Sequence, residues 1–84
     1  MQKNILETYN FGKALELKLW QDVRGYYTVY LGGLPVNIHT GNVATADDSP
    51  DDLMLNEHNM AYWYPTYRDA VRMFEQMKMQ YIES

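Results

Sequence analysis

The sequence of 84 residues predicts an α+β fold, an antiparallel β-meander of three to four strands packed by a C-terminal amphipathic helix. Two observations lead to this prediction. In the first half of the chain, apolar and polar residues alternate with a period of two, as they do in half-buried strands. Between residues 67 and 81, apolar side chains instead recur every three or four positions, as in a helix that covers one face of a sheet.

The predicted strands are short and are separated by turn residues. Four segments show alternation, or enrichment in aromatic and β-branched residues: 5–9, 15–20, 26–31 and 34–39. Turns are expected between them at 10–13, 22–25 and 32–33, where Gly, Asn and Asp occur. Pro35 cannot donate a hydrogen bond to a neighbouring strand, so the last strand should lie at an edge of the sheet.

The second half of the chain has two predicted helices. A loop with a short helix should occupy residues 40 to 60, because Ser49-Pro50-Asp51-Asp52 has the N-cap, first-turn Pro and acids of a helix start, and this helix should reach about His58. The final helix has a clearer start, with Thr66 as the N-cap and Asp69 three residues later. Its apolar face should consist of Tyr67, Ala70, Val71, Phe74, Met77 and Tyr81.

Length and composition predict one small globular domain over residues 1–84. No stretch approaches the roughly 18 consecutive apolar residues that a membrane span needs, and the N-terminal residues lack the apolar core of a signal peptide. The sequence contains no cysteine, which is typical of proteins from a reducing compartment. We therefore expect a cytoplasmic protein that does not bind membranes.

The net charge of −4 arises from one part of the chain. Residues 31–60 contain five acidic side chains and no Lys or Arg, and four of these acids are Asp47, Asp48, Asp51 and Asp52. Such a segment repels phosphate and attracts basic surfaces. It argues against direct nucleic-acid binding and favours a protein partner with a basic surface.

Eight tyrosines and two tryptophans form the most informative compositional feature. Large aromatic residues with a polar tip are enriched at protein interfaces as well as in half-buried sheets. We predict partner-binding roles for Tyr26, Tyr30, Tyr62, Trp63 and Tyr64. One helix cannot cover both faces of a sheet, so an aromatic face should be exposed or form a homodimer, unless residues 40–60 fold over it.

Catalytic chemistry has few candidates. The chain has two histidines, His39 and His58, and no spaced motif that would pair a nucleophile with a base. The acidic run lacks the ligand spacing of a calcium-binding loop. We therefore predict no enzyme activity, no catalytic residues, no cofactor and no metal site. A small hydrolase or metal site around the histidines and the acids is the least favoured alternative.

Three short motifs occur in the order strand, turn, strand and capped helix. They are Gly25-Tyr26-Tyr27-Thr28-Val29-Tyr30, Gly33-Leu34-Pro35 and Thr66-Tyr67-Arg68-Asp69-Ala70-Val71. Together they resemble HicB-type antitoxin domains over about half of the chain, with an acidic insertion in place of the family's glycine-rich loop. The resemblance implies a toxin-neutralising protein of this fold.

The overall profile is short, acidic, free of cysteine and rich in aromatic residues. In this respect the chain is similar to phage-encoded inhibitors such as anti-CRISPR proteins. The likeness implies a protein that inhibits by contact, here by occupying a basic surface that normally holds nucleic acid. An antitoxin and a self-assembling structural subunit stay open as alternatives.

Overall fold

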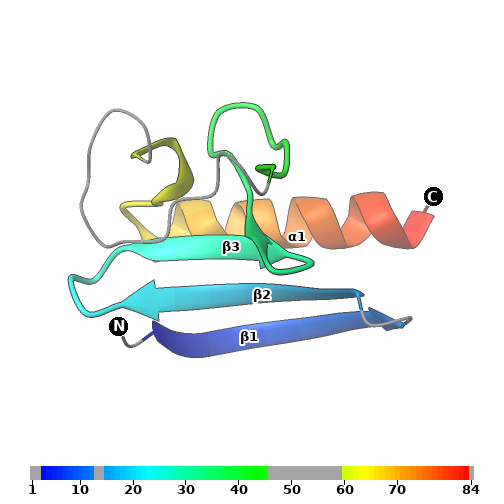
Figure 1. The fold of residues 1–84 in the computed structure, drawn as a ribbon, viewed down its shortest axis with the longest axis horizontal. Coiled ribbons are helices and arrows are strands. Elements are labelled where there is room, and N and C mark those ends of the chain that lie inside the picture. Colours follow the sequence, from blue (N-terminus) through cyan, green and yellow to red (C-terminus); the bar gives the residue numbers. More distant parts are fainter. Residues whose placement is uncertain (1–2, 13–14, 46–59, 84) are drawn as a thin grey trace.

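The computed structural model describes residues 3–12, 15–45 and 60–83 and confirms the predicted α+β meander with its C-terminal helix (Figure 1). Four antiparallel strands lie in the order β1-β2-β3-β4 and form an open sheet. The strands are β1 (Lys3–Gly12), β2 (Leu15–Asp22), β3 (Tyr27–Leu31) and β4 (Leu34–Pro35). A 3-10 helix η1 (Met60–Tyr62) precedes the long helix α1 (Tyr67–Glu83). The acidic helix expected to reach His58 lies outside the described residues.

One face of the sheet forms the hydrophobic core with α1, which packs mainly across β2 and β3. Leu17, Leu19 and Val29 are fully buried there, as the alternation of β2 and β3 predicts. The same alternation places Trp20 and Tyr30 on the opposite face, where the centres of their rings are 6.2 Å apart. The period of two therefore decides which side chains meet the helix.

The last strand is shorter than predicted, because β4 ends at Pro35 rather than at His39. The Asn37 side-chain oxygen accepts the N–H groups of His39 and Thr40 at 2.7 and 3.1 Å. This local hydrogen bonding competes with the ladder and turns the chain out of the sheet. After the turn, Val43 pairs with Val36 in a single antiparallel bridge.

Two glycines make the hairpin between β3 and β4. Gly32 and Gly33 have φ values of +63° and +86°. A two-residue hairpin in which both residues have positive φ matches the twist of its flanking strands, and only small residues adopt that conformation easily. The Gly-Gly pair thus explains why the chain reverses here.

Helix α1 begins as predicted. The Thr66 hydroxyl accepts the backbone N–H of Asp69 at 3.2 Å and donates to the Asp69 carboxylate at 2.9 Å. The side chains that the helix buries are Ala70, Met73, Phe74 and Met77. Within the described residues, no helix is long and apolar enough to cross a membrane.

Candidate protein-binding surface

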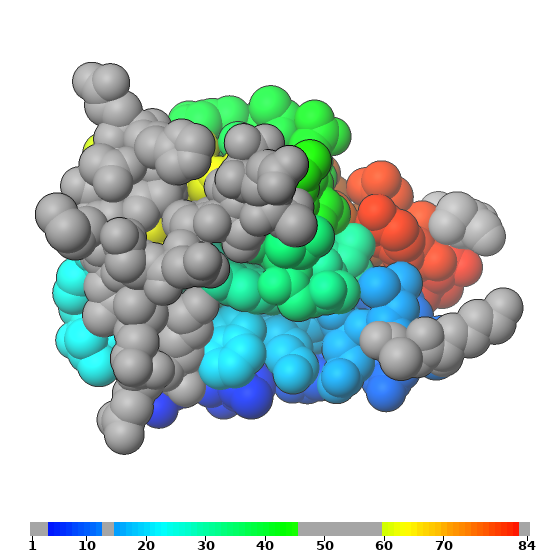
Figure 2. Space-filling model, viewed as in Figure 1, coloured from blue at the N-terminus to red at the C-terminus, as the bar shows by residue number. Residues whose placement is uncertain are grey.

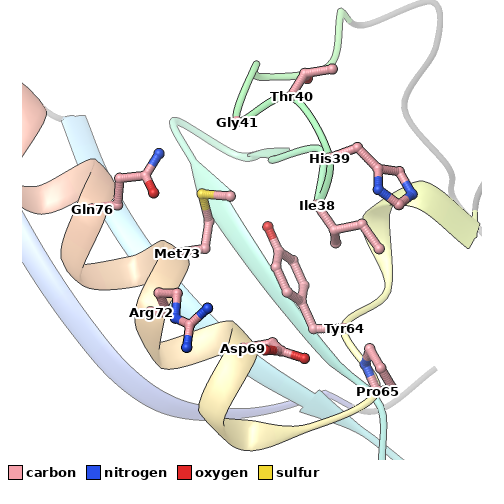
Figure 3. A pocket seen from close by; sticks show the side chains of 10 residues that line it. All are labelled: Ile38, His39, Thr40, Gly41, Tyr64, Pro65, Asp69, Arg72, Met73 and Gln76. Carbon is pink, nitrogen blue, oxygen red and sulfur yellow. The ribbon is translucent and has the colours of Figure 1, made fainter.

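Two neighbouring hollows share the residues Ile38, His39 and Pro65, and one of them borders α1. The first, the loop hollow, separates the helix from the loop at 38–41 and has a volume of about 460 Å³ (Figure 3). Its lining residues are Ile38, His39, Thr40, Gly41, Tyr64, Pro65, Asp69, Arg72, Met73 and Gln76. Asp69, Arg72 and Gln76 of α1 line one side together with Met73, and the Tyr64 ring lies between the helix and the loop, so this hollow has a mixed chemical character.

The second hollow, the aromatic hollow, has a volume of about 630 Å³ and a mainly apolar lining. It is lined by Tyr26, Ile38, His39, Met60, Ala61, Trp63 and Pro65. Ile38, His39 and Pro65 line both hollows, which therefore adjoin along these residues. In Figure 3 the His39 ring points away from α1.

A buried carboxylate organises the wall of the aromatic hollow. The Asp22 side chain has no exposed surface and accepts the backbone N–H groups of Arg24 and Tyr26 at 2.9 and 3.0 Å. It also accepts the Nε–H of the Arg24 guanidinium at 2.9 Å, and Nη2 of Arg24 forms an ion pair with the same carboxylate oxygen at 2.7 Å. A buried charge needs such partners, because leaving it without them costs several kcal/mol.

The guanidinium of Arg24 in turn lies over two aromatic rings. Its central carbon is 5.5 Å from the centre of the Tyr26 ring and 4.9 Å from that of Trp63. Both distances are within the range of cation–π attraction. Asp22 and Arg24 therefore hold Tyr26 and Trp63, which come from distant parts of the sequence, on the same hollow.

Tyr64 joins this region to the sheet. It exchanges both backbone hydrogen bonds with Tyr27, and its hydroxyl donates to the carbonyl of Val36 at 3.1 Å. Because the side chain is 2% exposed, burial raises the pKa of Tyr64 above its ordinary value. The Ile38 N–H donates to the Ala61 carbonyl at 2.7 Å, which fixes the loop against η1.

The structure brings three of the predicted binding residues together. Tyr26 and Trp63 line the aromatic hollow and Tyr64 lines the loop hollow. Trp63 and Tyr64 are only 4% and 2% exposed. Their rings are therefore part of the lining of the hollows and do not project into solvent. Tyr62 is half-buried, and its carbonyl accepts the Thr28 hydroxyl at 2.9 Å.

The other predicted residues lie elsewhere. Tyr30 is half-buried and lines a separate hollow of about 230 Å³, on the sheet face opposite α1, together with Trp20 and Lys18. Asp47, Asp48, Asp51 and Asp52 lie outside the described residues, so their role as a contact for a basic partner stays a prediction.

Sequence reasoning missed Asp22, Arg24 and Met60. The only local signal was the turn sequence Asp22-Val23-Arg24-Gly25, in which Asp is suited to accept backbone N–H groups two and four residues later. Nothing in the sequence pattern shows that Arg24 meets Trp63, because that contact depends on how the two segments fold together.

Within the described ranges, no group of three or more His, Cys, Asp or Glu side chains is arranged to hold a metal ion. Comparison of the chain with models of protein families, with curated proteins and with solved structures found no match. The candidate function therefore depends on the geometry and the sequence of this chain alone.

Proposed function

We propose that this chain is a non-enzymatic protein-binding module that inhibits a partner with a basic surface, in the manner of small phage-encoded inhibitors such as anti-CRISPR proteins. The aromatic hollow receives an apolar side chain of the partner. The acidic residues of 47–52 attract the basic groups of the partner. The absence of cysteine from the sequence supports a cytoplasmic setting.

One observation carries the proposal, namely an apolar hollow walled by fixed aromatic rings. Apolar and aromatic pockets that are formed before binding are common sites for the anchor residues of a partner, because little entropy is lost in ordering them. Arg24 and Asp22 hold Tyr26 and Trp63 in place, and Met60, which is 54% exposed, also lines the hollow.

The sequence adds a second support. Asp52 comes eight positions before Met60, the first residue of η1. Charges around an apolar anchor increase the association rate and select against the wrong partner, whereas the anchor itself slows dissociation. An acidic segment and an apolar hollow in one chain suit a ligand that combines an apolar side chain with Lys or Arg.

The test of the hollow uses two methionines of similar exposure. Met60 at the hollow and Met79 on α1 are 54% and 58% exposed. The wild type and the Met60→Gln and Met79→Gln variants are used to capture partners from host lysate, and the captured protein is then purified and titrated by calorimetry. We expect Met60→Gln to weaken binding by about fivefold or more and Met79→Gln to leave it within about twofold. Equal effects of the two substitutions would refute the assignment of the hollow.

The acidic segment is tested with the same purified partner. Replacing Asp47, Asp48, Asp51 and Asp52 by Asn should lower the association rate and remove most of its salt dependence between about 50 and about 500 mM NaCl. Dissociation should change little. If the Asn variant keeps both the association rate and the salt dependence of the wild type, the partner does not recognise the acidic segment.

A toxin-neutralising function is the second candidate. Its support is the resemblance of the three sequence motifs to HicB-type antitoxins, together with the order of the elements along the chain, which is β3, a Gly-Gly turn, β4 and the capped helix α1. Both candidates act by protein contact. Growth rescue of cells that express the captured partner would favour the antitoxin. Loss of that partner's nucleic-acid binding, without any effect on growth, would favour the inhibitor.

A further inference from the structure

The two edges of the sheet differ in how well they are protected. Strand β4 has two residues, contains Pro35, and continues into the Val36–Val43 bridge. Strand β1 is the longest strand, with ten residues and no proline, and forms one border of the molecule (Figures 1 and 2). Natural edge strands are usually shortened, covered or interrupted by Pro, because an open edge pairs with other strands.

The direction of the backbone groups on β1 follows from the hydrogen bonds of the neighbouring strands. The Gly32 N–H donates to the Glu16 carbonyl at 3.0 Å, so the backbone groups of Glu16 point toward β3. These directions alternate along an antiparallel strand, and those of Leu17 therefore point toward β1. Leu17 is paired with Tyr9, whose backbone groups must point back toward β2.

The neighbours of Tyr9 consequently direct their backbone groups out of the sheet. Thr8 and Asn10 each present one N–H and one C=O at this edge, and both residues are exposed. Among the residues that the structure describes, none forms a backbone hydrogen bond to this side of Thr8 or Asn10. Two exposed apolar side chains, Ile5 and Leu6 at 51% and 40%, lie on the same strand.

We propose that β1 pairs with β1 of a second copy of this chain, antiparallel and about a two-fold axis at Tyr9. This register sets Thr8 opposite Asn10 of the second copy, and Asn10 opposite Thr8 of the second copy. Both residues have outward backbone groups, so each pair can exchange two hydrogen bonds. A two-fold contact needs no other protein and converts two sheets of four strands into one of eight.

The side chains on the helix side fit the same register. Lys78 Nζ lies 4.8 Å from the centre of the Tyr9 ring, which places a positive charge beside the axis. Glu7 is exposed and lies two residues before Tyr9 on the same strand. In the dimer, Glu7 of the second copy is therefore the diagonal neighbour of Tyr9 across the two-fold axis. Neither residue has an ion pair among the described residues, so the dimer would join Lys78 with Glu7 of the second copy twice.

The first experiment is light scattering during size-exclusion chromatography from about 5 to about 500 μM protein, a range that reveals a micromolar dimer. The wild type should reach twice the 9.9 kDa mass of the chain at the higher concentrations. Thr8→Pro removes an N–H that points away from β2, so the monomer should fold while the dimer weakens at least tenfold. Thr8→Val keeps the N–H and should dimerise like the wild type.

A second variant tests the dimer independently, in case the proline variant misfolds. The double substitution Thr8→Lys and Asn10→Lys places like charges opposite each other on both sides of the axis, a common device against edge pairing. It should be monomeric with an unchanged circular dichroism spectrum. A wild type that stays monomeric at every concentration would overturn the proposal, as would a dimer that persists in the double-lysine variant.

Discussion

Arg24 offers the sharpest test of how the aromatic hollow is built. Its guanidinium makes a charge-assisted hydrogen bond and an ion-pair contact to a carboxylate with no exposed surface, and it lies over the rings of Tyr26 and Trp63. Replacing Arg24 by Ala leaves the Asp22 charge with only the backbone N–H groups of residues 24 and 26. We expect this single truncation to lower both the free energy of unfolding and the order of the hollow.

The magnitude follows from the geometry. Removing one partner of a buried ion pair typically lowers the free energy of unfolding by about 3–5 kcal/mol. Here the loss should be smaller, about 2–3 kcal/mol, because Asp22 keeps two backbone N–H donors and the Arg24 side chain is 27% exposed. A domain of this size has roughly 5 kcal/mol or less of stability, so the variant should lose about half of it. Arg24→Lys keeps the charge but not the planar fork, and should lose about 1 kcal/mol.

The assay is urea unfolding followed by tryptophan fluorescence and circular dichroism. A double-mutant cycle with Asp22→Asn separates the pair from its surroundings, and its coupling free energy should exceed about 1.5 kcal/mol. A loss below about 1 kcal/mol for Arg24→Ala is the value of an exposed salt bridge, and would refute the reasoning that the pair is buried and structural.

Two further predictions concern Tyr64 and Thr66. Burial keeps the phenol of Tyr64 neutral in the folded protein, whereas in the unfolded chain the same phenol ionises above its ordinary pKa of 10.0. The free energy of unfolding should therefore fall above pH 10.0, by up to about 1.4 kcal/mol per pH unit. Tyr64→Phe should remove this contribution and cost about 1 kcal/mol at neutral pH because the Val36 carbonyl loses its donor; urea unfolding at several pH values measures both effects. Thr66→Ala removes the N-cap of α1 and should cost about 1 kcal/mol in the same assay, while Thr66→Ser should cost only a few tenths.

The elements that the sequence predicted well are those with a strong local signal. Leu17 and Leu19 alternate with polar residues in β2, and Thr66 with Asp69 forms a capping pair, so both elements could be found without any tertiary information. The end of β4 was misjudged for a local reason as well, because the Asn37 side chain competes for the N–H groups that a longer strand would have used.

The site was harder to predict because it depends on contacts between distant segments. Tyr64 joins the sheet by pairing with Tyr27, 37 positions earlier, and this pairing carries Trp63 to Arg24. The aromatic clusters include Tyr26, Trp63 and Tyr64, which line the two hollows, but alternation alone does not distinguish a buried ring from an exposed one. Trp63 and Tyr64 prove to be structural walls, and exposed Met60 is the residue that the sequence pattern overlooked.

The dimer surface and the aromatic hollow lie at opposite edges of the sheet, so a partner can bind while the chain is a dimer. Strand β1 forms one edge of the sheet (Figure 1). Tyr64, whose neighbours Trp63 and Pro65 line the aromatic hollow, pairs with Tyr27 of β3 on the side away from β1. A dimer through β1 would therefore leave both aromatic hollows open, and would hold two partner molecules or two copies of one repeated surface. On a dense layer of immobilised partner, the wild type should dissociate at least tenfold more slowly than Thr8→Pro, although each hollow binds equally well in solution. Equal dissociation of the two proteins from the dense layer would show that the dimer and the binding surface act independently.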